Sequence, residues 1–410
     1  MVRPALIALL VTTAAGAQSV INPARAARAE RTLEAHEGGA PLRCDLTPLK
    51  PALNFGFRFQ AGYVFHVPLN QYSGPGHGLI AITRITPEGG DAKPVYLSHR
   101  MALPAVPKTN MEAEVGGVYL LGEGRYSVKW LLLDDSGRVC RKEWRIDAKL
   151  GRSERSVKLA IPERTVADLS LRTLPARPRS PDDAAPFRLT VLLNAAPLAP
   201  RRTSMRAGDR VMLLATLASF LERVPARSVR LIVFNLEQQK ILFRQDGFTP
   251  DEMDQVAQAI NELQLGLVDY HVLQNRTGHL DLLAGMVNEE LRAPEPSDAV
   301  VFLGPQARFA DKISEDVLEK PHGTAPHFFY LQFMPFPRIA PSVAPPPLAR
   351  QGPPLPPPPP VPGAGLAEPG MPDSISIAVA KLKGKTITLH TPGEFEKAIE
   401  QVERRTGGGS

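Results

Sequence analysis

The sequence lacks the short motifs that mark the most familiar enzyme sites. It contains no Gly-x-Ser-x-Gly turn, no glycine-rich loop that ends in Lys-Ser or Lys-Thr, and no His-Glu-x-x-His helix. Each motif carries a defined chemistry, namely a nucleophilic serine, a phosphate cradle or a zinc-bound water. Their absence removes the simplest sequence arguments for an enzyme and favours a protein that binds.

Long apolar runs are also missing, because no segment approaches the roughly 20 residues that a membrane-spanning helix needs. The first apolar run, Ala5 to Thr13, follows Arg3 and precedes the small residues Ala15-Gly16-Ala17. This order is typical of a secretory signal peptide, here residues 1–17, with cleavage before Gln18. A membrane anchor is the alternative, but the run is short for one. We therefore expect a secreted or periplasmic protein that does not span a membrane.

Cysteine is scarce, with only Cys44 and Cys140 among 410 residues. Two thiols outside the cytosol tend to oxidise, and these two flank a region of strand-like segments. The sequence therefore predicts a disulfide between the first and last strands of that region. The chain-entropy model gives such a long loop roughly 4–5 kcal/mol of stabilisation. Two separate buried thiols are the alternative.

Basic residues exceed acidic ones, 48 against 42, and give a formal charge of +6. The arginines are spread along the chain, with no dense basic helix and no alternation of basic and aromatic residues. Nucleic-acid binding is expected to need such a cluster. The composition therefore predicts a solvated basic surface and no nucleic-acid partner.

The first half of the chain has the pattern of a β-sandwich. After an exposed lead-in at 18–40, residues 41–150 contain short apolar runs separated by turn residues about every 8–12 positions. The run Leu53 to Phe59 alternates, which predicts a strand with its phenylalanines on one face. Trp130 and Trp144 lie on two further predicted strands, and we expect both to pack in the core. Residues 151–186 are rich in Arg, Pro and Ser and predict a connector.

From residue 187 the pattern changes to alternating strands and helices. The expected strands are Arg188–Leu193, Ser228–Leu236, Lys240–Phe243, Ala299–Leu303, His327–Phe333 and Lys385–Leu389. The expected helices are Asp209–Val224, Pro250–Leu263, Thr277–Leu291, Pro372–Leu382 and Pro392–Arg404, and Asp373 is expected to cap the fourth of these. The Pro-rich stretch 335–372 interrupts this order between 187–334 and 373–405, and its composition predicts an extended insertion. The whole predicts an α/β fold, with the β-sandwich followed by a Rossmann-like, mainly parallel, doubly wound sheet.

The order of these elements, with the phrases SVRLIVFNL, AVVFLGP and GKTITLHTPGEFEKAIEQVERR, resembles the von Willebrand factor A fold. The leader and the β-rich first half make the chain similar to the VWFA-related secreted proteins of the acidobacterial type. The resemblance covers residues 187–405 and implies a binding or adhesion module. It also implies a divalent-cation site at the carboxyl edge of the sheet, built from Asp-x-Ser-x-Ser, a later threonine and a later aspartate.

This sequence departs from that metal motif at most positions. Asn194 stands at the first position, Ala196 and Leu198 at the serine positions, and Gly304 near the later aspartate, while Thr277 matches the threonine. Hard cations need several oxygen ligands, at least one of them charged. We therefore expect a degenerate site with no metal and no cofactor, and a candidate binding surface at Asn194, Thr277 and Gly304.

The best chemical cluster lies at Thr277 to Asp281, where a helix is expected to begin. His279 and Asp281 are two residues apart and would point to different faces of a helix. Thr277 is also a natural helix cap, which is the simpler interpretation. The sequence favours a non-enzymatic module that binds a protein or an envelope polymer. A periplasmic hydrolase that uses His279 or Asp281, and a cation-dependent adhesin with an atypical site, are the alternatives.

Overall fold

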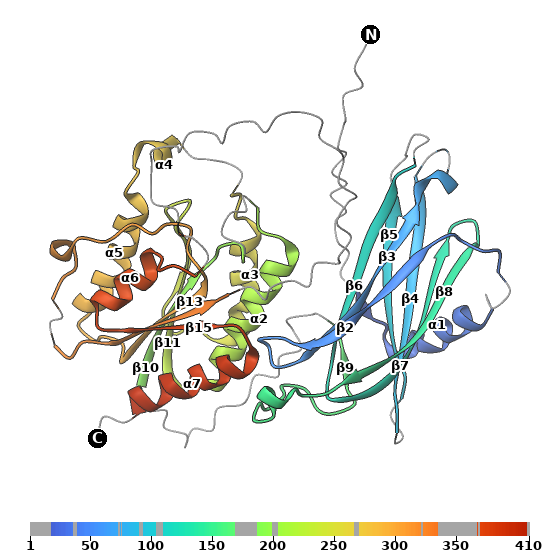
Figure 1. The fold of residues 1–410 in the computed structure, drawn as a ribbon, viewed down its shortest axis with the longest axis horizontal. Helices are drawn as coiled ribbons and strands as arrows, with labels where there is room; N and C mark the ends of the chain where they lie inside the picture. The colour runs from blue at the N-terminus through green and yellow to red at the C-terminus, as the bar shows by residue number, and fades with distance from the viewer. Residues whose placement is uncertain are drawn as a thin grey trace, which may run out of the picture. The chain divides into compact units, whose positions relative to one another are not determined.

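A computed structural model describes residues 18–35, 39–72, 74, 76–89, 93–103, 110–168, 187–198, 204–265, 270–320, 323–334, 367 and 370–407. The chain divides into two compact units, Met1–Thr173 and Leu174–Ser410 (Figure 1). The predicted signal peptide lies outside the described residues, as do 169–186 of the predicted connector and nearly all of the predicted Pro-rich insertion.

The first unit contains two antiparallel sheets. In spatial order, the five-stranded sheet consists of β1 (Ser19–Val20), β5 (Val95–Leu103), β4 (His77–Pro87), β7 (Gly124–Asp134) and β8 (Val139–Ala148). The four-stranded sheet consists of β2 (Asp45–Leu53), β3 (Phe59–Pro68), β6 (Glu112–Leu121) and β9 (Val166–Ala167). Short 3-10 turns occur at Leu69–Gln71 and Arg152–Glu154.

Aromatic side chains pack between these two sheets. The ring of Trp130 on β7 lies 5.5 Å from that of Tyr63 and 5.2 Å from that of Phe65, both on β3. Trp130 is buried, which confirms its predicted place in the core. The predicted disulfide between Cys44 and Cys140 is also confirmed, with their Cα atoms 6.2 Å apart. It joins the residue before β2 to β8, and so ties one sheet to the other.

Residues 18–35 are part of this unit rather than an exposed lead-in. Helix α1 (Pro23–Ala35) buries Ala29 and Leu33 against the outer face of the five-stranded sheet, where Ile82 and Leu131 lie. The two helix residues are four apart and therefore share one side of the helix. This narrow apolar side was not predicted, because the helix is rich in alanine and arginine and has few large apolar residues.

The strand predicted at Leu53–Phe59 is wrong, because β2 ends at Leu53 and β3 begins at Phe59. Between them, the Asn54 side-chain oxygen accepts hydrogen bonds from the backbone N–H groups of Gly56 (2.9 Å) and Arg58 (3.2 Å). Phe57 has a φ of 54°, which no strand residue adopts. An asparagine turn therefore overrides the alternating pattern, although the phenylalanines are buried as that pattern suggested.

The second unit contains a six-stranded sheet in the order β12-β11-β10-β13-β14-β15. The strands are β10 (Phe187–Asn194), β11 (Ala226–Asn235), β12 (Lys240–Gln245), β13 (Ala299–Pro305), β14 (His327–Phe333) and β15 (Lys385–Leu389). The helices are α2 (Ala207–Arg223), α3 (Met253–Asn261), α4 (Tyr270–Gln274), α5 (Gly278–Arg292), α6 (Ser374–Lys381) and α7 (Pro392–Gly407), with 3-10 turns at Pro250–Glu252 and Glu315–Val317. Neighbouring strands pair in parallel except β11 and β12.

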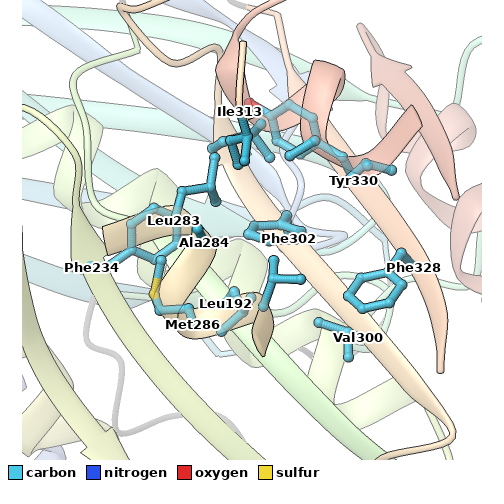
Figure 2. Packing of buried hydrophobic residues seen from close by; sticks show 14 of the residues in the cluster. Leu192, Phe234, Leu283, Ala284, Met286, Val300, Phe302, Ile313, Phe328 and Tyr330 are labelled. Carbon is cyan, nitrogen blue, oxygen red and sulfur yellow. The ribbon is translucent and has the colours of Figure 1, made fainter. Parts of the chain in front are cut away.

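Buried side chains cover both faces of this sheet. On one face, Leu192, Phe302 and Tyr330 of three adjacent strands meet α5 and α6 in a single apolar cluster (Figure 2). Residues that alternate with Leu192 along β10 point to the opposite face. Phe220 of α2 and Phe395 of α7, which lie outside that cluster, stack with ring centroids 6.5 Å apart. The parallel strands are thus buried on both sides, as their continuous apolar sequence requires.

The fold class predicted for the chain, an α/β fold of Rossmann-like, doubly wound type, is wrong. Across the residues that the structure describes, strand makes up 39% and helix 29%, and two of the three sheets found there are antiparallel. The long hairpin strands of the first unit, such as β4 and β7 with 11 residues each, account for this balance. The prediction gave most weight to the strand and helix alternation after residue 187. The chain is better described as β-rich.

Among the helices that the structure describes, none combines the length and apolar character that crossing a membrane would require.

Candidate functional site

The carboxyl ends of the parallel strands meet at one edge of the six-stranded sheet, which we call the carboxyl edge. Asn194 and Asn235 are the last residues of the neighbouring strands β10 and β11, while β13 ends at Pro305. Ligands commonly bind at this edge of open parallel sheets. A ligand-binding site of the second unit is therefore expected at this edge.

Both asparagines are buried and hold the chain that surrounds the edge. The side-chain amide of Asn194 donates a hydrogen bond to the backbone oxygen of Pro305 over 3.1 Å. The amide of Asn235 donates to the backbone oxygen of Ala195 over 2.7 Å, and its Oδ1 accepts from the N–H of Gln238. Asn194 is only 1% exposed, and its Oδ1 has no hydrogen-bond partner. Their positions indicate a structural role in joining strands to loops.

Gly304 lies directly against Asn194. A Cβ atom at Gly304 would fall 2.8 Å from the backbone oxygen of Asn194 and 2.9 Å from its Cβ. Gly304 also has a φ of 148°, in the region that favours glycine. The close approach of β10 and β13 here therefore needs glycine. The metal-site hypothesis for Gly304 did not predict this packing role.

Asp373 is the most connected side chain of the carboxyl edge. Its Oδ2 accepts hydrogen bonds from the backbone N–H of Ala307 (2.6 Å), the Tyr330 hydroxyl (3.0 Å) and the Gln332 amide (3.3 Å). Its Oδ1 accepts from the N–H of Ser376, which confirms the predicted cap of α6. The sequence indicated the cap, but not the three partners that lie 41 to 66 residues away.

Burial sets the ionisation of this carboxyl and its tyrosine neighbour. Burial raises the pKa of Asp373, while the hydrogen bonds from Ser376 and Ala307 oppose that rise. Burial and the adjacent Asp373 carboxylate raise the pKa of Tyr330 well above its ordinary value. Tyr330 therefore keeps its proton and can donate it either to Asp373 or to the oxygen of Pro305, 2.8 Å away. The network satisfies its own members, as a buried polar network must.

A second group of polar side chains lies in the segments that follow β11 and β13 and precede α5. Arg308 and Glu237 form an ion pair with a 3.0 Å N–O distance. Burial raises the pKa of Glu237, and Arg308 opposes the rise. Gln239 donates to the backbone oxygen of Asn275 over 2.8 Å. We call Glu237, Gln239, Asn275, Thr277, Arg308 and Asp311 the polar rim.

His279, at the start of α5, is buried beneath this rim. Its Nε2 lies 3.0 Å from Oδ2 of Asp311, and its ring stacks on Phe309 with centroids 4.2 Å apart. Burial lowers the pKa of His279, while Asp311 acts in the opposite direction. Asp281 is exposed and accepts a hydrogen bond from Asn275 rather than contacting the imidazole. His279 and Asp281 therefore do not act together, whereas the sequence gave no indication of the pair with Asp311.

The residues that the sequence placed at the degenerate metal site differ in exposure. Asn194, Ala196 and Gly304 are buried and Leu198 is half-buried, while Thr277 is exposed. Asn194 and Gly304 are in contact, but the hydroxyl of Thr277 donates to Asn275, 3.2 Å away. Thr277 occupies the cap position of α5 without capping it through its side chain.

These residues do not fit a divalent cation. Asn194 contributes one uncharged oxygen, and Ala196, Leu198 and Gly304 contribute no side-chain oxygen. Across the described parts of the chain, no three His, Cys, Asp or Glu side chains are grouped as a metal would need. The side chains at these positions therefore lack the donor set of a Mg²⁺ or Ca²⁺ site.

The first unit contains a small cavity between α1 and the outer face of the five-stranded sheet. Its volume is about 110 Å³, and its charged lining consists of Glu30, Glu34, Arg84, Lys129, Arg141 and Glu143. Glu30 pairs with Arg84 and accepts a hydrogen bond from Tyr96, and Lys129 pairs with Glu143 at 3.2 Å. The acids and bases balance one another, so the cavity has no preference for an ion of either sign.

Comparison with known proteins gives no family assignment. No family model matches the chain, and no curated protein does. Among solved structures, a putative ApaA protein from Bordetella pertussis is 11% identical over 27% of this chain and 98% of its own, with a TM-score of 0.18. The structural genomics target SoR45 is 12% identical over 30% and 95%, with a TM-score of 0.17. Spo0M, a sporulation control protein from Bacillus subtilis, is 12% identical over 28% and 51%, with a TM-score of 0.16. Similarity at this level carries no argument about function.

Proposed function

We propose that this chain is an exported, non-enzymatic module that binds another protein through the polar rim. The observation that carries the proposal is the division of roles at the carboxyl edge. The buried side chains of Asn194 and Asp373 at this edge form hydrogen bonds that hold strands and loops together. Thr277 in the rim is exposed, and Arg308 and Asp311 are partly accessible. Charged and polar groups of this kind orient a protein partner and speed its encounter.

Export is the second part of the proposal. Residues 1–17 have the order of charge, apolar run and small residues of a signal peptide. The disulfide between Cys44 and Cys140 fits an oxidising compartment. The resemblance of residues 187–405 to von Willebrand factor A domains motivates a binding role at the same edge. An envelope polymer would use the same surface and is an outcome of the test below.

Site-specific photocrosslinking tests the binding surface. A photoreactive residue at Thr277 should capture a distinct protein in the envelope fraction of the host, and one at Glu400, exposed on α7, should not. Arg308→Ala, with its partner variant Glu237→Ala, should weaken the Thr277 product because each disrupts one side of the rim ion pair. Equal capture from Thr277 and Glu400, or an unchanged yield in both alanine variants, would remove the rim from the proposal. Capture of glycan without protein would favour the polymer.

Near the polar rim, the pair of His279 and Asp311 favours a hydrolase. An imidazole oriented by a carboxylate is a common general base. The ring is nevertheless buried and stacked on Phe309, which limits the access of a substrate to it. Hydrolysis of ester or peptide substrates that disappears in His279→Gln, with binding retained, would replace the first proposal with this one.

A further inference from the structure

The side chain of Gln18 bridges the two sheets of the first unit. Gln18 precedes β1, and its Nε2 donates hydrogen bonds to the Tyr63 hydroxyl and to Oγ1 of Thr83, each over 3.3 Å. Tyr63 belongs to β3 of the four-stranded sheet, and Thr83 belongs to β4 of the five-stranded sheet. Both acceptors are fully buried. One amide group therefore connects the two layers inside the core.

The core leaves room for this amide only because a glycine faces it. A Cβ atom at Gly117 on β6 would fall 2.5 Å from the Tyr63 hydroxyl oxygen and 2.9 Å from Oε1 of Gln18. Burial raises the pKa of Tyr63, so its hydroxyl remains protonated as an acceptor for the amide. The arrangement is thus a fitted socket made by Tyr63, Thr83 and Gly117 around the Gln18 side chain.

Gln18 is also the residue that signal-peptide removal would leave at the amino terminus. We propose that the socket keeps Gln18 as an open-chain terminal glutamine in the folded protein, an inference that rests on the export and cleavage proposed above. A free terminal glutamine can cyclise: its α-nitrogen bonds to the side-chain carbon Cδ and gives up a proton, the bond from Cδ to Nε2 breaks, and Nε2 takes up a proton and leaves as ammonia. The product is a lactam, and no oxidant or reductant takes part.

The nitrogen lost in that reaction is the one that donates hydrogen bonds to both sheets. While Nε2 donates to Tyr63 and Thr83, the side-chain amide is held in the core by two buried partners, and ring closure would have to expel this same nitrogen. Cyclisation therefore requires the side chain to leave the socket, which is a local opening of the native structure. A chain that cyclises before it folds has no amide to donate, and both buried acceptors lose that donor. The amino terminus is thus a site of glutamine cyclisation that becomes protected when the chain folds.

Mass spectrometry of the mature protein tests this inference. The full chain is exported to a bacterial periplasm and purified with its disulfide intact. Folded chain, and chain unfolded in urea, are then each incubated with glutaminyl cyclase. The amount of enzyme is adjusted so that its activity on a free peptide is the same in both solutions. The folded chain should begin at Gln18 and lose ammonia at least about 100-fold more slowly than the unfolded chain, because cyclisation has to wait for local opening. Tyr63→Phe with Thr83→Val removes both acceptors and should accelerate the loss from the folded chain, whereas Glu34→Gln on the exposed side of α1 should not.

The possible results separate the proposals. A mature chain that begins at Gln18 but cyclises equally fast when folded overturns the socket and leaves export intact. A mature chain that begins at any other residue overturns both the cleavage site and the socket. If the double variant does not fold, the comparison of folded and unfolded wild-type protein still decides, and so does Thr83→Val alone. Crosslinking from Thr277 is independent of each of these results.

Discussion

The two units of this protein join distant parts of the chain in different ways. In the first unit, the buried carboxylate of Asp134 accepts hydrogen bonds from Ser136 and Arg138, which lie within the turn that links β7 to β8. A covalent connection there joins Cys44 to Cys140, which are 96 residues apart. In the second unit, Asp373 connects segments up to 66 residues apart through hydrogen bonds. The two sheets of the first unit are thus joined by a disulfide, by apolar packing and by the Gln18 amide, whereas one buried acid connects most of the segments at the carboxyl edge.

Removing the disulfide should have the largest effect. The double variant Cys44→Ala/Cys140→Ala should lower the free energy of unfolding of the first unit by about 4–5 kcal/mol, because the unfolded chain regains the freedom of a long loop. Both tryptophans, Trp130 and Trp144, lie in this unit, so their fluorescence during urea unfolding reports on it alone.

Reduction of the wild-type protein provides the control for that variant. It should shift the fluorescence transition by a similar amount, while the part of the circular dichroism signal that comes from the second unit stays in place. A shift below about 1 kcal/mol would mean that apolar packing alone closes the sandwich, and would contradict the comparison.

The two buried acids should differ in the reach of their effects. Asp373→Ala should cost about 3 kcal/mol, because it leaves the buried donors of Ala307 and Gln332 without their acceptor and removes a helix cap. Asp134→Ala should cost about 1–2 kcal/mol, because the N–H groups of its turn can reach water. Hydrogen exchange should show faster exchange at Ala307 and Ser376 in the first variant, and only at the turn in the second. Equal losses of stability in the two variants, with faster exchange confined to the residues next to each substitution, would contradict the long-range role of Asp373.

Local chemistry in the sequence predicted much of the fold, and long-range geometry was the part it missed. The cap of α6 by Asp373 and the disulfide follow from residue type and compartment. The turn at Asn54 was missed because three phenylalanines mimic a strand, whereas a side chain that bonds its own backbone decides the conformation. The class of the whole chain was missed because the hairpin strands outweigh the helices.

The candidate site was predictable only in its location. The metal-site positions Asn194 and Gly304 do lie at the carboxyl edge. The hydrogen bonds that stabilise this edge were not predicted. Asp373 meets Ala307 and Tyr330 because strands that are distant in sequence end side by side. Likewise, nothing in the spacing of residues joins His279 to Asp311. Such pairs exist only once the sheet order is fixed.

Glycines at close approaches offer a matched comparison of smaller size. Gly304→Ala should cost about 1–3 kcal/mol, because the new Cβ meets the backbone of Asn194 and the residue has a φ of 148°. Gly117→Ala should cost a similar amount, because its Cβ would overlap the Tyr63 ring. Urea unfolding followed by fluorescence should detect only the Gly117 variant, and circular dichroism should detect both. Gly285→Ala, where a Cβ meets nothing, is the control and should be neutral or slightly stabilising.

The smallest predicted effect concerns the buried imidazole of His279. Burial lowers its folded pKa, so the unfolded chain binds the proton more readily, and stability must fall as pH drops through the unfolded pKa. Relative to His279→Gln, the wild-type protein should lose less than about 1 kcal/mol of stability between about pH 7.5 and pH 5. Asp311→Asn removes the charge that favours the protonated ring and should steepen this loss. Urea midpoints from circular dichroism across that pH range measure it. A shallower loss in Asp311→Asn would mean that Asp311 does not stabilise the imidazolium, and that the rim and the buried histidine are independent.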